Sequence, residues 1–357
     1  MAHDLRKASS ALREIEELAE AGLTAQQLLE QSGPLIDSVV PTDGYFLGAT
    51  DPETTLVMGA GVVHDLPLDQ CAPTWDYEFL VPDYLKFNDI ADSGRVIGDL
   101  HEETGGKPMR SPRWREFGAA TGFRSEVRAT FTAGTGLWGI GQFDRLGDAP
   151  PFSDPEKAWL AQVSPLIARG LRRAMAAHSE SVPASRGPGV LLLDPAGAVV
   201  SATSEAAAWL DEIEGIPTGT PIPLETQAYA SRVRAGADGD AAVPTGRVRT
   251  RSGVWLLMHG SLLEGTDQLA LVIEPAKAAD IAPLIVEAYG LSQREVDVTK
   301  LIARGLGTSE IAATLFLSPH TVRDHIKAVF EKAGVSSRGE LVAKVFADHY
   351  SPPMAHV

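Results

Sequence analysis

The sequence predicts a multidomain α+β protein, in which two antiparallel-sheet domains are followed by an all-α domain of four helices. The chain has 357 residues, more than one ordinary hydrophobic core serves, so we expect two or three domains. Short apolar runs typical of strands recur before residue 275, whereas the chain beyond it shows helical patterns only. We place the domains at residues 1–180, 187–275 and 283–350.

Composition excludes several classes of protein. The hydrophobic content of 44% and charged content of 22% are those of a globular protein. No apolar run approaches the roughly 18 residues of a membrane span, and the charged N-terminus lacks a signal-peptide core, so we expect a cytoplasmic protein without a membrane partner. The single cysteine, Cys71, excludes a disulfide framework and a cysteine-clustered zinc site. We expect no metal site and no cofactor.

The first region begins with two helices, the second over residues 24–40. Apolar runs typical of strands follow, and the last two form a hairpin about a Gly-Thr-Gly turn. A long helix then begins at Ser153, where Glu156 completes a capping box. The expected strands cover residues 44–50, 55–63, 125–133 and 137–145.

The second region repeats the mixture of strands and helix. Residues 189–203 read as two strands about a Pro-Ala-Gly turn, and residues 204–213 as a short helix. Two further segments, 246–264 and 267–276, complete an antiparallel set. Residues 234–246 are small and predict a loop.

The third region contains helical patterns at 293–304, 308–315, 319–333 and 337–348. The second and third are joined by three residues only, and Ser318 can cap the third with Pro319 at its first position. Such a pair predicts a helix-turn-helix, the second helix of which reads DNA. One stripe of that helix is polar and the opposite one is apolar. The polar stripe holds His320, Arg323, Asp324, Lys327 and Glu331, and the apolar one Val322, Ile326, Val329, Phe330 and Ala333.

Charge is distributed unevenly along the chain. Residues 291–350 hold eight Lys/Arg and seven Asp/Glu, although the whole chain has a net charge of −16. An acidic body with a nearly neutral C-terminal segment repels a polyanion everywhere except at one end.

The segment LSQREVDVTKLIARGLGTSEIAATLFLSPHTVRDHIKAVFEKAGVSSRGELVAKVF resembles the LuxR/GerE-type DNA-binding domain. The recurring features are Leu-Ser-x-Arg-Glu at the start, Gly305, Ile311-Ala312, Ser318-Pro319, Thr321-Val322, His325, Lys332, Gly334-Val335 and Arg338-x-Glu340-Leu341. The resemblance implies a sequence-specific, dimeric transcriptional regulator whose partners are a double-stranded DNA operator and RNA polymerase. In this family dimers form through the last helix, where Leu341, Val342, Val345 and Phe346 fit either the core or the dimer contact.

The second helix of the pair should enter the major groove with its N-terminal half near base edges. Arg323 or Lys327 can donate to guanine, and Asp324 can accept from cytosine or pair with one of these two cations. His325 is expected to pack. The candidate DNA contacts are Thr308, Ser309, Ser318, His320, Thr321, Arg323, Asp324 and Lys327; the hydroxyl residues among them can cap helices, bind phosphate, or do both.

The first region resembles a GAF domain in its order of strands, aromatic segment, hairpin and long helix. The second resembles a PAS domain, because GVLLLDPAGAVVSATSEAAAWL matches an opening strand pair and helix. Such domains often hold a small-molecule cavity, so an unknown effector is expected to modulate DNA binding. The candidate cavity residues are Trp75, Tyr77, Phe79, Tyr84 and Phe87, with Arg128 to pair an acidic ligand; ordinary core packing is the alternative.

No catalytic motif occurs, so no catalytic residues and no enzyme are expected. Two alternatives remain: a sensory or scaffold protein whose C-terminal helices bind protein, and a regulator whose GAF-like domain only dimerises and senses no ligand. The long helix at 153–179 suggests one route to a dimer. Its second apolar stripe is expected to pair with a partner copy and comprises Ala158, Leu160, Val163, Ile167, Leu171 and Ala174.

Overall fold

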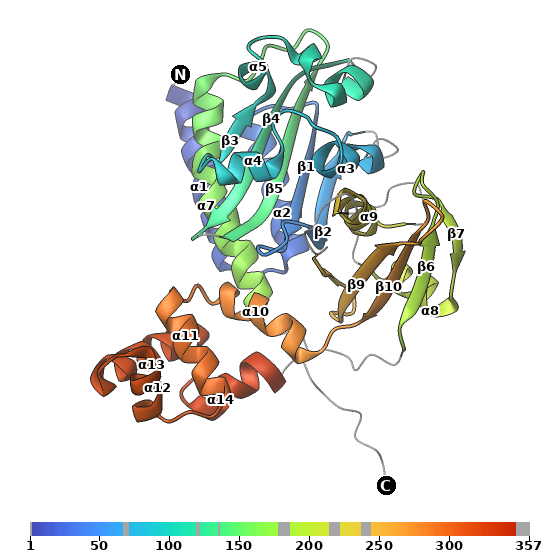
Figure 1. Ribbon diagram of the computed structural model, residues 1–357. Helices are drawn as coiled ribbons and strands as arrows, with labels where there is room; N and C mark the ends of the chain where they lie inside the picture. Colours follow the sequence, from blue (N-terminus) through green and yellow to red (C-terminus); the bar gives the residue numbers. More distant parts are fainter. Residues whose placement is uncertain are drawn as a thin grey trace. The chain divides into compact units, whose positions relative to one another are not determined.

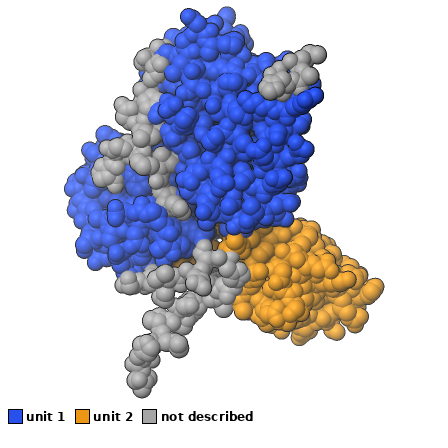
Figure 2. Space-filling model, turned by 180° about the vertical axis from the view of Figure 1, so that it is seen from behind, with its two compact units in different colours: residues 1–174, 184–275 blue, residues 175–183, 276–357 orange. Residues whose placement is uncertain are grey.

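The computed structural model describes residues 2–66, 71–118, 122–134, 136–177, 186–213, 222–236 and 244–347. It confirms the α+β class, with two five-stranded antiparallel sheets followed by helices. The chain forms two compact units, which Figure 2 colours separately. One unit holds residues 1–174 and 184–275, with both sheets, and the other holds residues 175–183 and 276–357. The division into three domains stays a prediction.

The first sheet has the strand order β2-β1-β5-β4-β3. Its strands are β1 (Gly44–Thr50), β2 (Val57–His64), β3 (Ile97–Asp99), β4 (Phe123–Ala133) and β5 (Gly136–Leu146). Its helices are α1 (Ala2–Glu20), α2 (Ala25–Val39), α3 (Cys71–Phe79), α4 (Phe87–Asp92), α5 (Leu100–Glu103) and α7 (Asp154–Ala176), with short turns at Pro108–Arg110 and Trp114–Gly118.

Helices α1, α2 and α7 form one layer beside this sheet (Figure 1). The indole N–H of Trp159 on α7 donates to the carbonyl of Ala8 on α1 at 3.1 Å. Gly170 permits the close approach, since a Cβ there would lie 3.0 Å from Cα of Ala19 and 2.6 Å from the side chain of Leu28. Absence of a side chain at one helical position therefore lets three helices pack together.

The second apolar stripe expected on α7 is not free, and that expectation is corrected. Leu160, Val163, Ile167 and Leu171 are at most 1% exposed within their own domain. The Leu171 side chain approaches Gly139 of β5, where a Cβ would lie 2.6 Å from its methyl group. The stripe is buried because α7 packs on its own sheet, and only Ala158 of the stripe is exposed.

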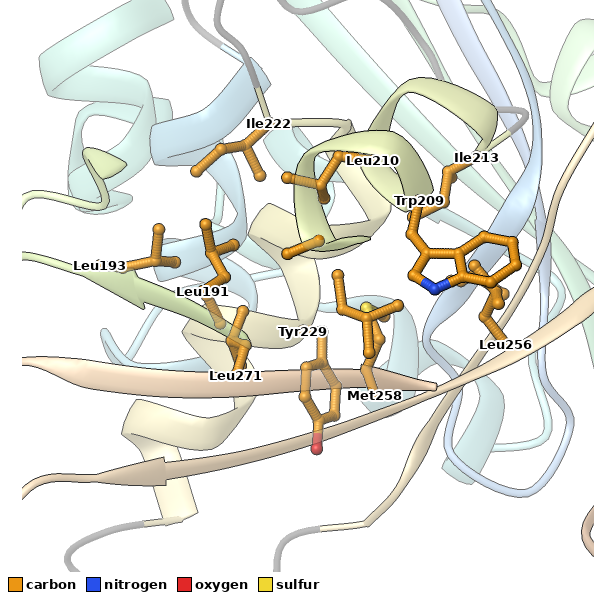
Figure 3. Packing of buried hydrophobic residues seen from close by; sticks show 14 of the residues in the cluster. Leu191, Leu193, Trp209, Leu210, Ile213, Ile222, Tyr229, Leu256, Met258 and Leu271 are labelled. Atoms are coloured by element: carbon orange, nitrogen blue, oxygen red, sulfur yellow. The ribbon is translucent and has the colours of Figure 1, made fainter. Parts of the chain in front are cut away.

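The second sheet has the order β7-β6-β10-β9-β8. Numbered within each sheet, both orders read 2-1-5-4-3, so the two sheets share one topology. The elements are β6 (Gly189–Leu193), β7 (Val199–Ala202), α8 (Ser204–Glu212), α9 (Leu224–Gly236), β8 (Gly246–Arg249), β9 (Trp255–Leu262) and β10 (Leu269–Pro275). Figure 3 shows the core between this sheet and its helices, in which Trp209 of α8 and Tyr229 of α9 are the largest side chains.

The two sheets are joined by polar and apolar contacts within their unit. Arg247 of β8 donates to Asp51 at 2.8 Å and to Glu53 at 2.9 Å. Helix α9 packs against α3, where Ser231 donates to Asp76 at 2.7 Å. These contacts couple helix α9 to the first sheet.

The second unit contains α10 (Ala278–Ala288), α11 (Gln293–Ala303), α12 (Thr308–Leu315), α13 (Pro319–Ala333) and α14 (Arg338–Val342), followed by a π-helical turn at Ala343–Ala347. Leu341 and Val345 are each 1% exposed and belong to its core. Of the apolar residues considered for a dimer contact, Val342 is partly buried against the same core. The side chain of Phe346 lies outside the described part.

The expected strands were found within two residues of their predicted ends, but several elements were not predicted, namely α3, α4, α5, α9, β3 and α10. Helix α9 takes in residues 234–236 of the expected loop, and residues 237–243 of that loop lie outside the described residues. β3 has three residues, too few to show an alternation, and α10 begins before the expected helical segment. Within the described part, no helix is long and apolar enough to cross a membrane. The same residues contain no cluster of His, Cys, Asp and Glu that could hold a metal ion.

Gly189 provides a test of the second core. A Cβ at this position would lie 2.3 Å from the backbone nitrogen of Ala206 on α8, whereas nothing lies within 4 Å of one at Gly187. We expect Gly189→Ala to lower the free energy of unfolding by about 1–3 kcal/mol. Gly187→Ala should change it by about 0.5 kcal/mol or less. Urea unfolding followed by tryptophan fluorescence measures both, and equal effects would contradict the close contact.

Candidate functional site

Helices α12 and α13 form the predicted helix-turn-helix. Three residues connect them, and the first, Phe316, adopts a left-handed conformation with φ of 56°. The Leu317 N–H donates to the carbonyl of Ala312 at 2.9 Å, which ends α12 tightly. The angle between the two helices is therefore set by backbone hydrogen bonds and needs no long loop.

The first turn of α13 is capped and exposed. The hydroxyl of Ser318 accepts from the N–H of Thr321 at 3.1 Å, and Pro319 fills the first helical position, which needs no N–H partner. His320 is exposed at this end. The first turn of a helix presents N–H groups and a partial positive charge, both of which favour an anion such as a DNA phosphate.

The two faces of α13 separate as the sequence predicts. Val322, Ile326, Val329 and Ala333 are buried in the core of the unit, with Phe330 packed partly against it. Arg323, Asp324 and Lys327 are exposed, and His325 lies between the faces with intermediate burial. Because the buried face holds the helix, the exposed side chains are presented on a fixed support.

Ion pairs on the exposed face are long and exposed. The imidazole of His320 lies 3.8 Å from Asp324, and Lys327 lies 3.8 Å from Glu331. Asp324 thus lies near His320, an ion pair only when the imidazole is protonated, and no ion pair with Arg323 or Lys327 is found among the described residues, which corrects the local pairing that the sequence suggested. Within the described part of the chain, Arg323 has no ion-pair partner. Exposed pairs of this kind are worth little, so the side chains remain available to a partner.

Thr308 and Ser309 are the first two residues of α12, and Gly307 occupies the cap position. Neither hydroxyl residue therefore caps the helix. The Thr308 hydroxyl accepts a hydrogen bond from Arg338 at 2.8 Å, and Arg338 also donates to the carbonyl of Leu306 at 2.6 Å. Ser309 is exposed. Sequence reasoning missed Arg338 as the residue that fixes this end of α12, although its position recurs in the family motif.

A charged contact ties α11 to α13. Glu295 accepts from the Ser292 N–H at 2.6 Å and from the Lys332 ammonium at 2.7 Å, and Lys332 also donates to the carbonyl of Gly290. Burial disfavours the charged carboxylate, but the hydrogen bonds from Lys332 and Ser292 prevail and lower the pKa of Glu295. This contact holds the far end of α13 in place.

Three of the six residues proposed for a ligand site line one cavity beside the first sheet. The cavity has a volume of about 60 Å³. Trp75, Phe87 and Arg128 contribute to its wall, together with Phe46, Leu66, Thr74, Glu78, Gln142 and Leu224.

The other three predicted residues lie elsewhere. Phe79 stacks on Trp75 with ring centroids 6.0 Å apart, and Tyr84 lies beneath the guanidinium of Arg110. Tyr77 meets Phe117 edge to face, and burial and a hydrogen bond with Glu116 raise the pKa of Tyr77 to about 12. These residues pack around the cavity rather than line it.

The structure does not leave Arg128 free for an acidic ligand. Its guanidinium is 1% exposed and donates to Glu78 at 2.9 Å, to the carbonyl of Leu85 at 3.0 Å and to Gln142 at 3.1 Å. Its Nε lies 2.9 Å from Glu126. Carboxylates, an amide and a backbone carbonyl already surround the guanidinium, so pairing with an anion would require their displacement.

Sequence reasoning missed the polar partners that surround Arg128, namely Glu78, Arg113, Glu126, Gln142 and Asp144. A signal was present in the strand over residues 123–133, where Glu126 and Arg128 are two apart and therefore share a face. Charged residues on the inner face of a strand require partners, and such partners can be sought on the neighbouring strand.

Comparison with known proteins identifies the C-terminal domain. Residues 290–345 match the family described as bacterial regulatory proteins, luxR family. They therefore form a domain of this family, which confirms the predicted recognition of the C-terminal domain.

Two relatives match this domain alone. The probable transcriptional regulatory protein NarL of Mycobacterium tuberculosis is 41% identical over 68 residues, 19% of this chain and 29% of that protein. The oxygen regulatory protein NreC of Staphylococcus aureus is 46% identical over 52 residues, 15% of this chain and 24% of that protein. The chain thus spans less than a third of the length of either relative.

Solved structures align with larger parts of the chain, but with low TM-scores. A GAF domain from an Acinetobacter phosphoenolpyruvate-protein phosphotransferase covers 48% of this chain and 95% of its own, with 11% identity and a TM-score of 0.32. Escherichia coli SdiA covers 96% of this chain and 99% of its own, with 12% identity and a TM-score of 0.30. Scores this low do not establish a shared fold, and the strand orders given above stand on their own.

The Glu295–Lys332 contact predicts a pH dependence for the second unit. Because the pKa of Glu295 is lowered on folding, its charge stabilises the unit at neutral pH. That contribution is lost as the pH falls from the ordinary pKa of 4.5 through the lowered value. We expect Glu295→Gln to cost about 1–2 kcal/mol at pH 7, a modest figure because Lys332 is 40% exposed.

Hydrogen exchange at pH 7 and pH 4 measures the stabilisation that the Glu295 contact provides. The protection of the α11 and α13 amides is compared after correction for intrinsic exchange rates. The wild type should lose protection at the lower pH, and Glu295→Gln should lose less. Glu331→Gln is the matched control, because its pair with Lys327 is exposed. Equal losses in all three proteins would show that Glu295 does not link the helices.

Proposed function

We propose that the chain is a DNA-binding transcriptional regulator whose helix α13 enters the major groove of a double-stranded operator. The observation that carries the proposal is the exposed Arg323 and Lys327 on a capped, core-anchored helix of a luxR-family domain. A helix of this kind reads base edges through side chains near its N-terminal half.

Each candidate residue has a role that its chemistry supports. Arg323 donates to O6 and N7 of a guanine, and Lys327 to a guanine or a phosphate. Asp324 accepts a hydrogen bond from cytosine N4 once its contact with His320 is broken. His320 and Thr321 lie near the start of the helix. Ser318, Thr308 and Ser309 stand at the N-termini of α13 and α12, where phosphate contacts are favoured; Arg338 holds Thr308 for this purpose.

One such domain makes few phosphate contacts, and the rest of the chain is acidic. Affinity then requires two copies on a pseudo-palindromic operator, so we propose a homodimer, located in the cytoplasm and acting with RNA polymerase. The dimer surface is neither the α7 stripe nor Leu341 and Val345, because these residues are buried within their own units.

The two sheet domains are proposed to modulate DNA binding as GAF-like and PAS-like sensory domains. The cavity of the first sheet has Leu224 of α9 in its wall, so an occupant touches both sheet domains. An effector that favours one arrangement of these domains would change the population of the dimer that fits the operator.

A gel shift with genomic fragments tests whether the chain binds specific DNA sequences. Retention of specific fragments in the presence of excess nonspecific DNA supports a regulator. If no fragment is retained and the C-terminal helices instead bind a protein, the scaffold alternative is correct. If DNA is bound and no small molecule alters it, the GAF-like domain only assembles the protein.

Arg323→Ala should relax base preference at one operator position and cost about 1–3 kcal/mol of binding free energy, because a bidentate contact to one base pair is lost. A scan of all single-base variants of the retained fragment measures the preference. Arg124→Ala, an exposed arginine of the first sheet domain, is the control and should have no effect. Uniform weakening across all base variants would assign Arg323 to a phosphate.

Lys327→Ala distinguishes a backbone contact from a base contact. If the ammonium binds a phosphate, one fewer counterion is released, and the slope of log affinity against log salt becomes smaller by about one. Titrations at several salt concentrations, with Arg124→Ala as the control, give the slope. An unchanged slope together with altered preference at one base pair would place Lys327 on a base instead.

A further inference from the structure

A second cavity of about 60 Å³ adjoins the one described above and shares Leu66, Thr74 and Gln142 with it. Its further wall residues are Arg113, Trp114, Phe117, Gly118, Phe123, Glu126 and Asp144. At about 10–15 Å³ for each water-sized group, such a volume accommodates about four to six non-hydrogen atoms. The cavity therefore suits a small molecule or the end of a larger one.

Carboxylates outnumber guanidiniums around the two cavities. Arg113 and Arg128 face four acids whose side chains are at most 6% exposed, namely Glu78, Asp83, Glu126 and Asp144. Three of the acids are paired: Glu126 with both arginines, Glu78 with Arg128, and Asp83 with Arg113 at 3.5 Å. The fourth, Asp144, forms no ion pair with any described residue.

Asp144 is 1% exposed and accepts a single side-chain hydrogen bond, from Gln142 at 2.8 Å. The register of β4 and β5 sets it directly opposite Glu126, and like charges in that position repel each other. Burial and the charge of Glu126 raise the pKa of Asp144 well above its ordinary range. Positive charge in the cavity would relieve both the burial and the repulsion.

Aromatic rings line the same cavity as Glu126 and Asp144. Trp114, Phe117 and Phe123 line the same cavity, and a ring face attracts a cation most strongly where water is excluded. The two guanidiniums beside the cavity are not available to an anion, because Arg113 donates to Glu126 at 2.7 Å and Arg128 is surrounded by its own partners.

We propose that this cavity binds a small organic cation, with a primary ammonium against Asp144 and a short apolar body against Trp114, Phe117 and Phe123. This inference rests on the proposed function, because the organic cation is proposed as the effector of the regulator. The first cavity continues toward Leu224 of α9, so a longer cation would reach the second sheet domain. The site thus links charge recognition in one sheet domain to a helix of the other.

The test compares three probes of similar shape and different charge, n-butylamine, 1-butanol and butyrate. Titration of the full chain without DNA, followed by ligand-observed NMR, should give an affinity for n-butylamine about tenfold or more above that for the other two. Binding of butyrate or 1-butanol as tight as that of n-butylamine overturns the proposal, as does an absence of n-butylamine binding.

Two variants locate the site. Asp144→Asn resembles the protonated acid in shape and should lower n-butylamine affinity about tenfold, whereas Asp92→Asn, on the exposed end of α4, should leave it unchanged. If Asp144→Asn fails to fold, Phe123→Leu replaces it and should weaken n-butylamine more than 1-butanol. Equal affinity in wild type and the folded variant overturns the assignment. A gel shift is run separately, so loss of cation binding and loss of DNA binding are distinguished.

Discussion

The fully buried guanidinium of Arg128 is the interaction on which the first sheet domain depends. A charge removed from water needs hydrogen-bonding and charged partners, and here the hydrogen bonds come from Glu78 of α3, the carbonyl of Leu85 and Gln142 of β5. Phe87 of α4 covers the guanidinium at 4.4 Å from its ring centroid. One side chain thereby fixes the helices that flank the cavity relative to the strands beneath it.

The cavities lie on the face of the first sheet that carries these buried charged residues. Alternate residues of β4 and β5 point to one side, so Glu126 and Arg128 meet Asp144 and Gln142 across the strands. All four of these side chains line the two cavities. On the opposite face, Leu171 packs against Gly139 without a gap. The polar register thus separates a face that carries the two cavities from a face that packs against α7.

Local signals predicted most of the fold, because strand alternation, caps and turns are recorded within a few residues. Ser318 and Pro319 predicted the start of α13, and its two faces followed from helical spacing. The cavity was predicted only in part, since Arg128 was identified while Asp144 and Glu78 come from distant segments. The partner of Arg128 depends on which strands and helices meet, and spacing along one chain does not contain that information. The α7 stripe failed for the same reason: an apolar face is equally suited to the chain's own core and to a second copy.

The proposed regulation would depend on small differences in free energy between arrangements of the domains. An effector shifts an equilibrium only by the difference in its affinity for the two states, and a tenfold difference corresponds to about 1.4 kcal/mol. The wall shared between the sheet domains supplies a place where such a difference can arise, because Leu224 and Trp75 touch the same cavity while α9 packs against α3. The second sheet has the strand order of the first. A ligand in the first cavity would contact α3 through Trp75 and α9 through Leu224, so its binding energy would bear directly on the contact between these two helices.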